Sequence, residues 1–546
     1  MIPVLCRNCD KAFCMLSSQN ADWVVSAGYR RLLPASHGEG VEVLSLECVS
    51  SQFAICPGLF QPSAANDGLL SRLRVPGGLL TVTQCEAIAD LADQLGGGYV
   101  EVTNRANVQI RGLQSTIDAD HLARLQAVGL ASPVAAIDAL RNIMCSPTAG
   151  IDRQQLLDTR PFVAAWNRYL TTRPDFAVLS PKFSVCFDGG EAVSVRDRPN
   201  DISLVAVAIT DAIYFRLHLS LGDRGASPCD TGVVIQPEES LQLLIAMTEV
   251  YRDYTMQKLG NSSQRKPRLR NLLHDWGLAT YLQAVVQRLS FLPLRDGTKS
   301  LRQNEKIDGN SFSDAYNHLG IHSQRQSDRS YIGCILPLGR LETIQLRGLA
   351  TLASQYGSSM LRLTPWQNVL LSDLPTAQIA VVQQKIEQLG LHSSATHPHG
   401  AIVACSGTTG CQSSATNTQA DALALAAHLE QTIVLSYPVN IHFSGCEKSC
   451  AQHHASDIAL LGVAQEGEAS YHVYVGDDGS KFGRSLYQNY RPAHLPALIE
   501  QMLRVYQEQS QSHETFKSFV NRYKIAELKQ MLIASDRHLI GARQQN

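Results

Sequence analysis

The sequence predicts an internally duplicated α/β protein, and two observations lead to this fold class. Residues 72–114 align with residues 333–375 without a gap, so the chain contains a repeat. The chain is also long, and 546 residues with 44% hydrophobic content can bury several separate cores. We therefore expect two copies of a small module, each followed by a larger α/β module, around a pseudo-twofold axis.

Each copy of the repeat predicts the same order of elements: an apolar strand, an amphipathic helix, and two short strands joined by a turn. The turn carries Thr103 and Asn107 in the first copy, and Thr364 and Asn368 in the second. In the first copy Thr83 and Glu86 have the spacing of a capping box, and the glycines at 96–98 are expected to end the helix.

The correspondence continues beyond the small modules. The segment CSPTAG (145–150) matches CSGTTG (405–410), and KFSVC (182–186) matches HFSGC (442–446). The second half has extra cysteines at these turns, whereas the first half has Arg141 and Lys182. A working site at the seam between the halves would combine thiolates from one half with positive charge from the other.

This organisation divides the chain into five expected units. They are an N-terminal extension (1–65), a first small module (66–135), a first larger module (136–326), a second small module (327–398) and a second larger module (399–546).

The composition argues against nucleic acid and membrane partners. Lys and Arg number 47 against 49 Asp and Glu, so no long-range field attracts a polyanion. The basic run at 264–277 lacks interleaved aromatic residues and is weak evidence for nucleic acid. No long apolar run and no cleavage-type leader is evident, which predicts a cytoplasmic protein.

Four of the 14 cysteines have a spacing that indicates a metal cluster. Cys405 and Cys411 form a C-x5-C pair, and Cys446 and Cys450 form a C-x3-C pair 34 residues later. Four thiolates on two tight loops are what a 4Fe-4S cluster requires. Structural zinc and unligated cysteines are the weaker alternatives.

The N-terminal segment CRNCDKAFC (6–14) brings three further thiols together. A metal site there would need a fourth ligand from Cys48 or Cys56, so its role is left open.

The cysteine spacing, with GCEKSCAQ as its second pair, resembles the siroheme-dependent nitrite and sulfite reductase superfamily. The resemblance implies ferredoxin-like half-domains for the two small modules and a 4Fe-4S cluster, with Cys450 bridging to the tetrapyrrole iron. It also implies tetrapyrrole-binding roles for Arg105 in TNRANVQ, Arg141 in LRNIMC and Lys182 in SPKFSV. A buried ring with many carboxylates requires fixed guanidinium and ammonium partners.

One position departs from the reductase pattern and directs the functional prediction elsewhere. The resemblance implies a second lysine two residues after Lys182 in sulfite reductases and commonly asparagine in nitrite reductases, but here it is Ser184. A short neutral serine would hold an oxyanion weakly. The run CPGLFQPSAANDGLLSRLRVPGGLLT (56–81) is similar to the precorrin-3B synthase branch of the superfamily.

That branch implies an oxidoreductase of cobalamin biosynthesis, a monooxygenase that hydroxylates precorrin-3A at C20 with O2 and closes a lactone. A mononuclear iron has been proposed for the branch, but the sequence shows no ligand set for it. His442, His453 and His454 lie near the cluster cysteines and are candidate ligands or proton carriers. Catalytic residues are not identified.

Two alternative functions are kept. One is a ferredoxin-dependent nitrite or sulfite reductase with siroheme, and the other is a non-catalytic redox sensor that binds a tetrapyrrole or a cluster. No nicotinamide- or flavin-type motif is evident, so the electron donor is expected to be a separate ferredoxin or reductase.

Overall fold

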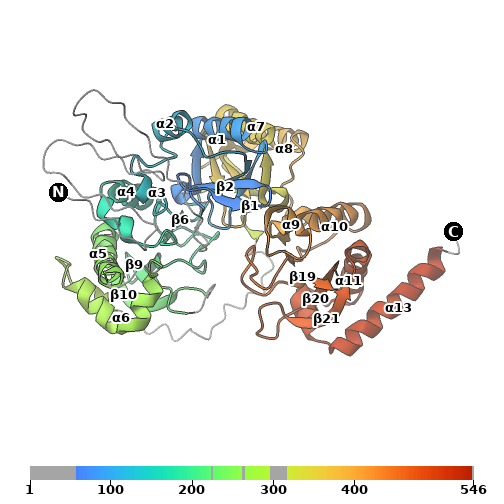
Figure 1. Ribbon diagram of the computed structural model, residues 1–546. Coiled ribbons are helices and arrows are strands. Elements are labelled where there is room, and N and C mark those ends of the chain that lie inside the picture. Colours follow the sequence, from blue (N-terminus) through green and yellow to red (C-terminus); the bar gives the residue numbers. More distant parts are fainter. Residues whose placement is uncertain (1–56, 223–225, 261–264, 296–315, 466, 544–546) are drawn as a thin grey trace, which may run out of the picture.

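The computed structural model describes residues 57–222, 226–260, 265–295, 316–465 and 467–543. The N-terminal cysteines at 6, 9, 14, 48 and 56 lie outside these residues. Figure 1 shows the two copies of the repeat packed together at the top, with one larger module below on each side.

Each copy of the repeat forms an antiparallel sheet of five strands, and the two copies exchange one strand. The first sheet has the order β1 (Ser63–Ala65), β2 (Gly68–Leu73), β5 (Val108–Leu113), β4 (Tyr99–Val102) and β14 (Arg340–Glu342). The second has the order β12 (Gly320–Ser323), β13 (Arg329–Cys334), β16 (Val369–Pro375), β15 (Met360–Leu363) and β3 (Leu79–Thr81). Strand β14 thus comes from the second copy and β3 from the first, so the exchange is reciprocal and joins the two copies.

The turn that links the last two strands of each copy repeats its hydrogen bonds. In the first copy the Thr103 hydroxyl accepts from the Asn107 amide at 3.1 Å, and Asn107 Oδ1 accepts from the Val75 amide at 2.8 Å. In the second copy the corresponding distances are 3.0 Å at Thr364 and 3.0 Å at Leu336. The repeated Thr and Asn residues are therefore explained by one local structure.

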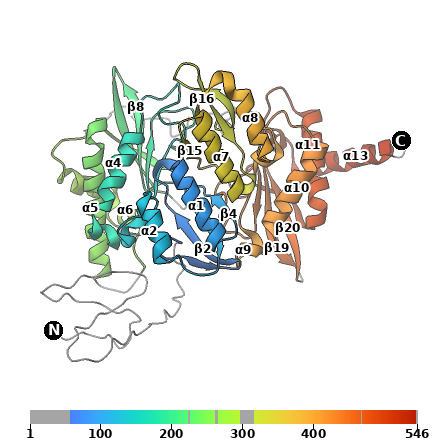
Figure 2. The ribbon, with the colours of Figure 1, turned by 90° about the horizontal axis from the view of Figure 1, so that it is seen from above.

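Helices α1 (Val82–Leu95) and α7 (Thr343–Tyr356) lie side by side and cover the upper side of the two sheets (Figures 1 and 2). Their buried apolar faces belong to a single core that both copies share. Helix α1 ends at Gly96, as expected. Its capping box differs from the expected Thr83 and Glu86, because the helix starts two residues earlier and is capped by Thr81 with Gln84.

Each larger module is built on a mixed sheet whose first three strands are parallel. Module 1 has the order β6 (Ile143–Cys145), β7 (Val185–Asp188), β8 (Ile202–Ile209), β9 (Ala212–Leu219), β10 (Cys229–Ile235) and β11 (Leu294–Arg295). Module 2 has the order β17 (Ile402–Ala404), β18 (Ile441–Ser444), β19 (Ile458–Gln465), β20 (Glu468–Val475) and β21 (Arg484–Tyr490). The predicted duplicated α/β architecture is confirmed.

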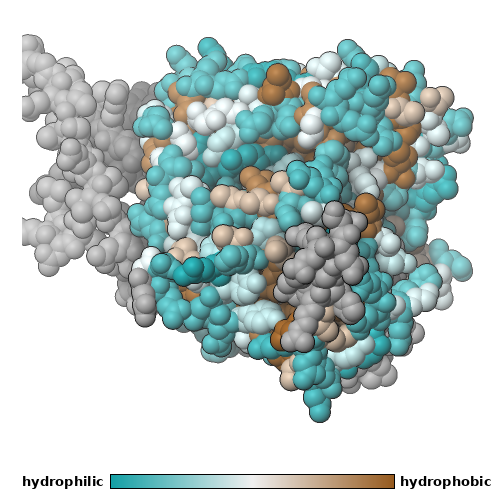
Figure 3. Space-filling view, turned by 90° about the vertical axis from the view of Figure 1, so that its right-hand side faces the viewer, coloured by the Kyte–Doolittle hydropathy of each residue, from teal (hydrophilic) through white to brown (hydrophobic). Residues whose placement is uncertain are grey.

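Helices complete the two modules. Module 1 carries α4 (Arg160–Thr171), α5 (Ser240–Leu259) and α6 (Leu269–Val286), and module 2 carries α10 (Thr418–Thr432), α11 (Leu495–Gln509) and α13 (Ile525–Arg543). Each module has its own hydrophobic core. The face on the right of Figure 1 is mainly hydrophilic, with apolar side chains in small separate groups (Figure 3).

Candidate active site

A cavity of about 1980 Å³ lies at the seam between the two halves of the chain. Arg105, Lys182 and Ser184 from the first half line it, and Cys450 and His453 from the second half line it as well. The seam predicted from the repeat therefore contains a large space. Its size suits a macrocyclic ligand more than a single small anion.

The cluster cysteines lie on two loops at the carboxyl ends of β17 and β18. These strands are parallel neighbours, so both loops leave the sheet at the same edge. The Cys405 amide donates to the Phe443 carbonyl at 3.1 Å, and the Ala415 amide donates to the Gly445 carbonyl at 2.8 Å. Two backbone hydrogen bonds therefore hold the loops of the first and second cysteine pairs together.

Close packing of these loops depends on two glycines. A Cβ at Gly445 would lie 1.8 Å from the Ser414 hydroxyl oxygen, so only glycine fits there. Gly407 has a φ of +64°, in the left-handed region that glycine adopts without strain. Both glycines lie within two residues of a cluster cysteine.

The arrangement fits a 4Fe-4S cluster. Cys405, Cys411 and Cys446 are half-buried, and Cys450 is exposed at the cavity wall. The Gly445 amide donates to Cys405 Sγ at 3.2 Å, and such N–H···S bonds to cluster thiolates help set the reduction potential. Cys450 is the cluster cysteine placed to face a ligand in the seam.

Arg105 lies at the cavity with its guanidinium anchored to module 1. Its Nη1 donates to Asn200 Oδ1 at 2.9 Å and its Nη2 to the Pro199 carbonyl at 2.7 Å. Burial lowers the pKa of Arg105 below its usual value, and the nearby Asp201 carboxylate opposes that shift. A half-buried, desolvated cation of this kind is stabilised by an anionic ligand.

Lys182 is exposed in the cavity, but Ser184 is buried and already engaged. Asp201 Oδ2 accepts from the Ser184 amide at 3.0 Å and from its hydroxyl at 3.3 Å. The same carboxylate is paired with Arg268 at 3.0 Å. The serine therefore belongs to a small charged network at the cavity wall.

Arg141 lies elsewhere than expected. It is 4% exposed and is not part of the cavity lining. Its guanidinium donates to Asp138 at 3.2 Å, to Asn167 at 3.1 Å and to the Gly129 carbonyl at 2.8 Å. These contacts hold the end of the half-domain against module 1, and the neighbouring Asn142 lines the cavity in its place.

The cavity contains more basic residues than the sequence reasoning identified. Outside the basic run 264–277 these are Arg72, Arg74, Arg196, Arg198 and Lys517, and the run itself contributes Arg265, Lys266, Arg268 and Arg270. The sequence pattern could have indicated Arg72 and Arg74, because RLRVPGG opens the first copy of the repeat and places these two arginines two residues apart on one strand face. The others are assembled only by the fold.

An aromatic stack forms another part of the wall. Trp366 occupies the position in the second copy of the repeat that corresponds to Arg105 in the first. The Arg198 guanidinium lies 4.5 Å from the centre of a Trp366 ring. His318 stacks on the same side chain at 4.7 Å. Burial lowers the pKa of Arg198 to about 10, so its guanidinium remains charged at neutral pH.

Both the small modules and the larger modules match models of known protein families. Residues 136–291 and 398–538 match the nitrite and sulphite reductase 4Fe-4S domain, and residues 61–128 and 322–389 match the nitrite/sulfite reductase ferredoxin-like half domain. The chain belongs to the nitrite and sulfite reductase family. The 4Fe-4S cluster and the ferredoxin-like half-domains expected from the sequence are thereby confirmed.

Curated relatives from this family carry reductase names. A ferredoxin–nitrite reductase of Synechococcus elongatus is 31% identical over 74% of this chain and 78% of the relative. A chloroplastic ferredoxin–nitrite reductase of Arabidopsis thaliana is 28% identical over 82% of this chain and 78% of the relative. A sulfite reductase [ferredoxin] 2 of Mycolicibacterium paratuberculosis is 27% identical over 77% of this chain and 76% of the relative.

A solved structure supports the fold. The Mycobacterium tuberculosis NirA protein is similar with a TM-score of 0.68 at 24% identity, over 84% of both chains. Within the described residues, no helix is long and apolar enough to cross a membrane.

These findings correct the prediction that the protein belongs to the precorrin-3B synthase branch. The relatives that match about three quarters of the chain are named nitrite and sulfite reductases, and neither a monooxygenase nor an enzyme of cobalamin biosynthesis is supported. The expected substrates precorrin-3A and O2 are withdrawn with that function.

Proposed function

We propose that the protein is a ferredoxin-dependent nitrite reductase. The observation that carries this proposal is the seam cavity, in which Cys450 of the second half faces basic residues of the first half. The names of the relatives support it. The electron donor is then an external ferredoxin, in agreement with the lack of a nicotinamide or flavin motif.

The basic lining suits a siroheme. Arg105, Lys182 and Arg268 are placed to pair with ring carboxylates, and such pairs are strong where water is excluded. A siroheme bound here would supply the iron at which nitrite is reduced, with electrons arriving through the 4Fe-4S cluster. The protein itself supplies position and charge.

The cluster cysteines reach the cavity through Cys450. Cys405, Cys411 and Cys446 are half-buried and outside the cavity lining, whereas Cys450 is part of it. Electrons from a donor at the outer surface would pass the half-buried thiolates before reaching the cavity. Protons for the departing nitrite oxygens are available from solvent-connected groups such as Lys182 and His453 in the same wall.

The position of Ser184 favours nitrite over sulfite. Nitrite carries one negative charge, whereas sulfite carries on average between one and two at neutral pH and gains more from an added cation. Ser184 provides no charge, and the Asp201 carboxylate beside it is anionic. Sulfite is the second candidate substrate, because one relative is named a sulfite reductase.

The experiment is an anaerobic assay of the purified holoenzyme with reduced ferredoxin. We expect nitrite to disappear and ammonium to form, with a lower kcat/KM for sulfite, and we expect chlorin-type absorption bands in the visible spectrum. Absence of both the chlorin bands and the ammonium would contradict the proposal. A kcat/KM that is higher for sulfite than for nitrite would identify the protein as a sulfite reductase.

A further inference from the structure

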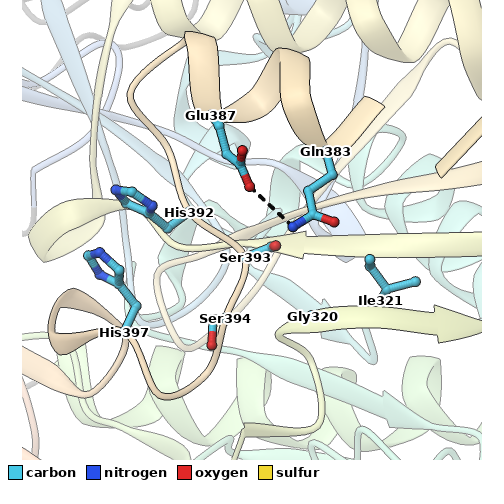
Figure 4. Close-up of a pocket in the computed structure, with 8 residues that line it drawn as sticks. All are labelled: Gly320, Ile321, Gln383, Glu387, His392, Ser393, Ser394 and His397. Atoms are coloured by element: carbon cyan, nitrogen blue, oxygen red, sulfur yellow. Dashed lines mark hydrogen bonds between the residues drawn. The ribbon is translucent and has the colours of Figure 1, made fainter. Parts of the chain in front are cut away.

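A group of metal-binding side chains lies outside the seam cavity, beside a small pocket of about 270 Å³. Ring nitrogens of His392 and His397 and a carboxylate oxygen of Glu430 all lie within 4.8 Å of one another. Figure 4 shows the two imidazoles next to each other at one end of this pocket, away from Gln383 and Glu387. The small pocket and the seam cavity share no lining residue.

The His397 and Glu430 side chains already have the separation of two ligands on one ion. His397 Nε2 lies 3.3 Å from Glu430 Oε1. Two ligands bonded to a tetrahedral zinc ion at about 2.0–2.1 Å are separated by roughly 3.3–3.4 Å. An ion would replace the proton that the two atoms now share.

His392 provides the second imidazole after a rotation of one ring. Its ring is stacked on that of His397, with centroids 3.8 Å apart and planes inclined by 15°. Two parallel rings cannot both direct a lone pair at one ion, so one ring must turn about χ2. That torsion is broad in histidine, so the turn costs little.

The backbone holds all three residues in place. The Ile335 amide donates to the His392 carbonyl at 2.7 Å, and the Gly400 amide donates to the His397 carbonyl at 2.8 Å. Glu430 lies in the last turn of α10. The ligands therefore come from the edge of the second half-domain, a tight turn and a helix of module 2.

The surroundings of the three side chains offer an unpartnered polar atom and access to water. In the described part of the chain, His399 Nδ1 is buried without a hydrogen-bond partner beside this group. The Glu430 side chain is 47% exposed, so water can reach a fourth coordination position.

We propose that His392, His397 and Glu430 bind one divalent transition-metal ion of the zinc class, with water as the fourth ligand. Two imidazoles and one carboxylate suit zinc better than calcium or magnesium, which prefer oxygen. The ion would fasten the second half-domain to helix α10 and stabilise the folded protein.

The test uses untagged holoenzyme with its iron-sulfur cluster intact, titrated with ZnCl2 after removal of loosely bound metal. We expect one zinc per chain by elemental analysis, a rise in the thermal midpoint, and X-ray absorption that shows nitrogen and oxygen ligands without sulfur. In His392→Ala, His397→Ala and Glu430→Gln the affinity should fall by at least about tenfold.

A matched control is available on the same helix. His428 pairs with Glu500 at 2.7 Å, which reproduces a histidine–glutamate pair without a second imidazole. His428→Ala should bind zinc like the wild type. Sulfur ligation, unchanged affinity in Glu430→Gln, or no binding by the wild type would each overturn the proposal. Glu430→Gln keeps the test valid if a histidine variant does not fold, because its side chain is half-exposed.

Discussion

Asp201 shows how one residue changes the interpretation of its neighbour. Ser184 is short and neutral, and from the sequence this argued against an oxyanion substrate. In the structure Asp201 binds both the serine and Arg268, so the local charge is set by a network and not by the serine alone. The serine alone is a poor guide to the substrate, because the basic residues around it come from distant segments of the chain.

Ser184 should nevertheless tune the choice between the two oxyanions. We expect Ser184→Lys to raise the kcat/KM for sulfite relative to that for nitrite by about tenfold, because a charge-assisted bond contributes roughly 1.5–3 kcal/mol. Steady-state kinetics with both substrates measure the ratio. Ser184→Asn is the control and should leave the ratio near the wild-type value. An unchanged ratio in the lysine variant would place the substrate away from this wall.

Cys450 should be required for the cluster and for turnover. Cys450→Ser is expected to lose the brown absorbance and most cluster iron, because the serine hydroxyl is a poorer ligand than thiolate. Iron and acid-labile sulfide per chain measure the loss. Cys229→Ser, at a half-buried thiol outside the cavity lining, should keep both. Full iron content in Cys450→Ser would contradict the assignment of this ligand.

Glu191 should make stability depend on pH. It lines the cavity at 2% exposure, and burial followed by the charge of Asp188 raises its pKa from 4.5 to about 8. The folded state then holds a proton that the unfolded state releases between pH 4.5 and about 8. Stability therefore falls as pH rises through this window, and it levels off above it.

We expect Glu191→Gln to reduce that fall, because a glutamine does not titrate. The measurement is the thermal midpoint by calorimetry from pH 5 to pH 8.5. Glu238→Gln, on an exposed turn, should retain the wild-type slope. Parallel curves for the wild type and Glu191→Gln would show that Glu191 ionises normally.

At the scale of elements, parallel strands β17 and β18 place the two cysteine loops side by side. The sequence located all four cysteines by spacing. It could not show that the Ala415 amide joins one loop to the other through Gly445. Such a contact depends on strand register, which local sequence does not encode.

Gly445 should therefore be intolerant of a methyl group. In Gly445→Ala the added Cβ would lie 1.8 Å from the Ser414 hydroxyl oxygen, so the loops must separate. We expect a lower cluster content and faster loss of absorbance in air, both measured spectroscopically. Gly58→Ala, where no atom lies within 4 Å of the added Cβ, should behave as wild type. Normal cluster retention in Gly445→Ala would contradict the close packing.

At the scale of the whole molecule, the pseudo-twofold pairing of α1 and α7 positions both halves of the site. Arg347 of α7 lies between three carboxylates of α1: Glu86 at 3.2 Å, Asp90 at 2.7 Å and Asp93 at 2.7 Å. Glu86 is the residue that corresponds to Arg347 in the first copy of the repeat. The two copies have thus diverged into opposite charges across their own interface.

Replacing Arg347 with Met should lower the thermal midpoint by a small amount that shrinks in high salt. The side chain is 32% exposed, so solvent and salt screen the three pairs. Differential scanning calorimetry at low and high ionic strength measures the effect. Arg288→Met, which removes a surface pair with Asp253, should change the midpoint less. An equal decrease of the thermal midpoint in both variants would mean that the three ion pairs of Arg347 stabilise the protein no more than one surface pair does.

The sequence by itself determined the duplication, the α/β class and the four cysteines, because repeats and ligand spacing are local patterns within the chain. The boundaries of the five units and the cytoplasmic location stay predictions. The tertiary structure decided which basic residues reach the cavity: it placed Arg141 in a structural contact and brought Arg72, Arg198 and Lys517 to the wall. Side chains from distant segments meet only when strands exchange between the copies and the modules close around the seam. These long-range contacts are not encoded in any local pattern of the sequence.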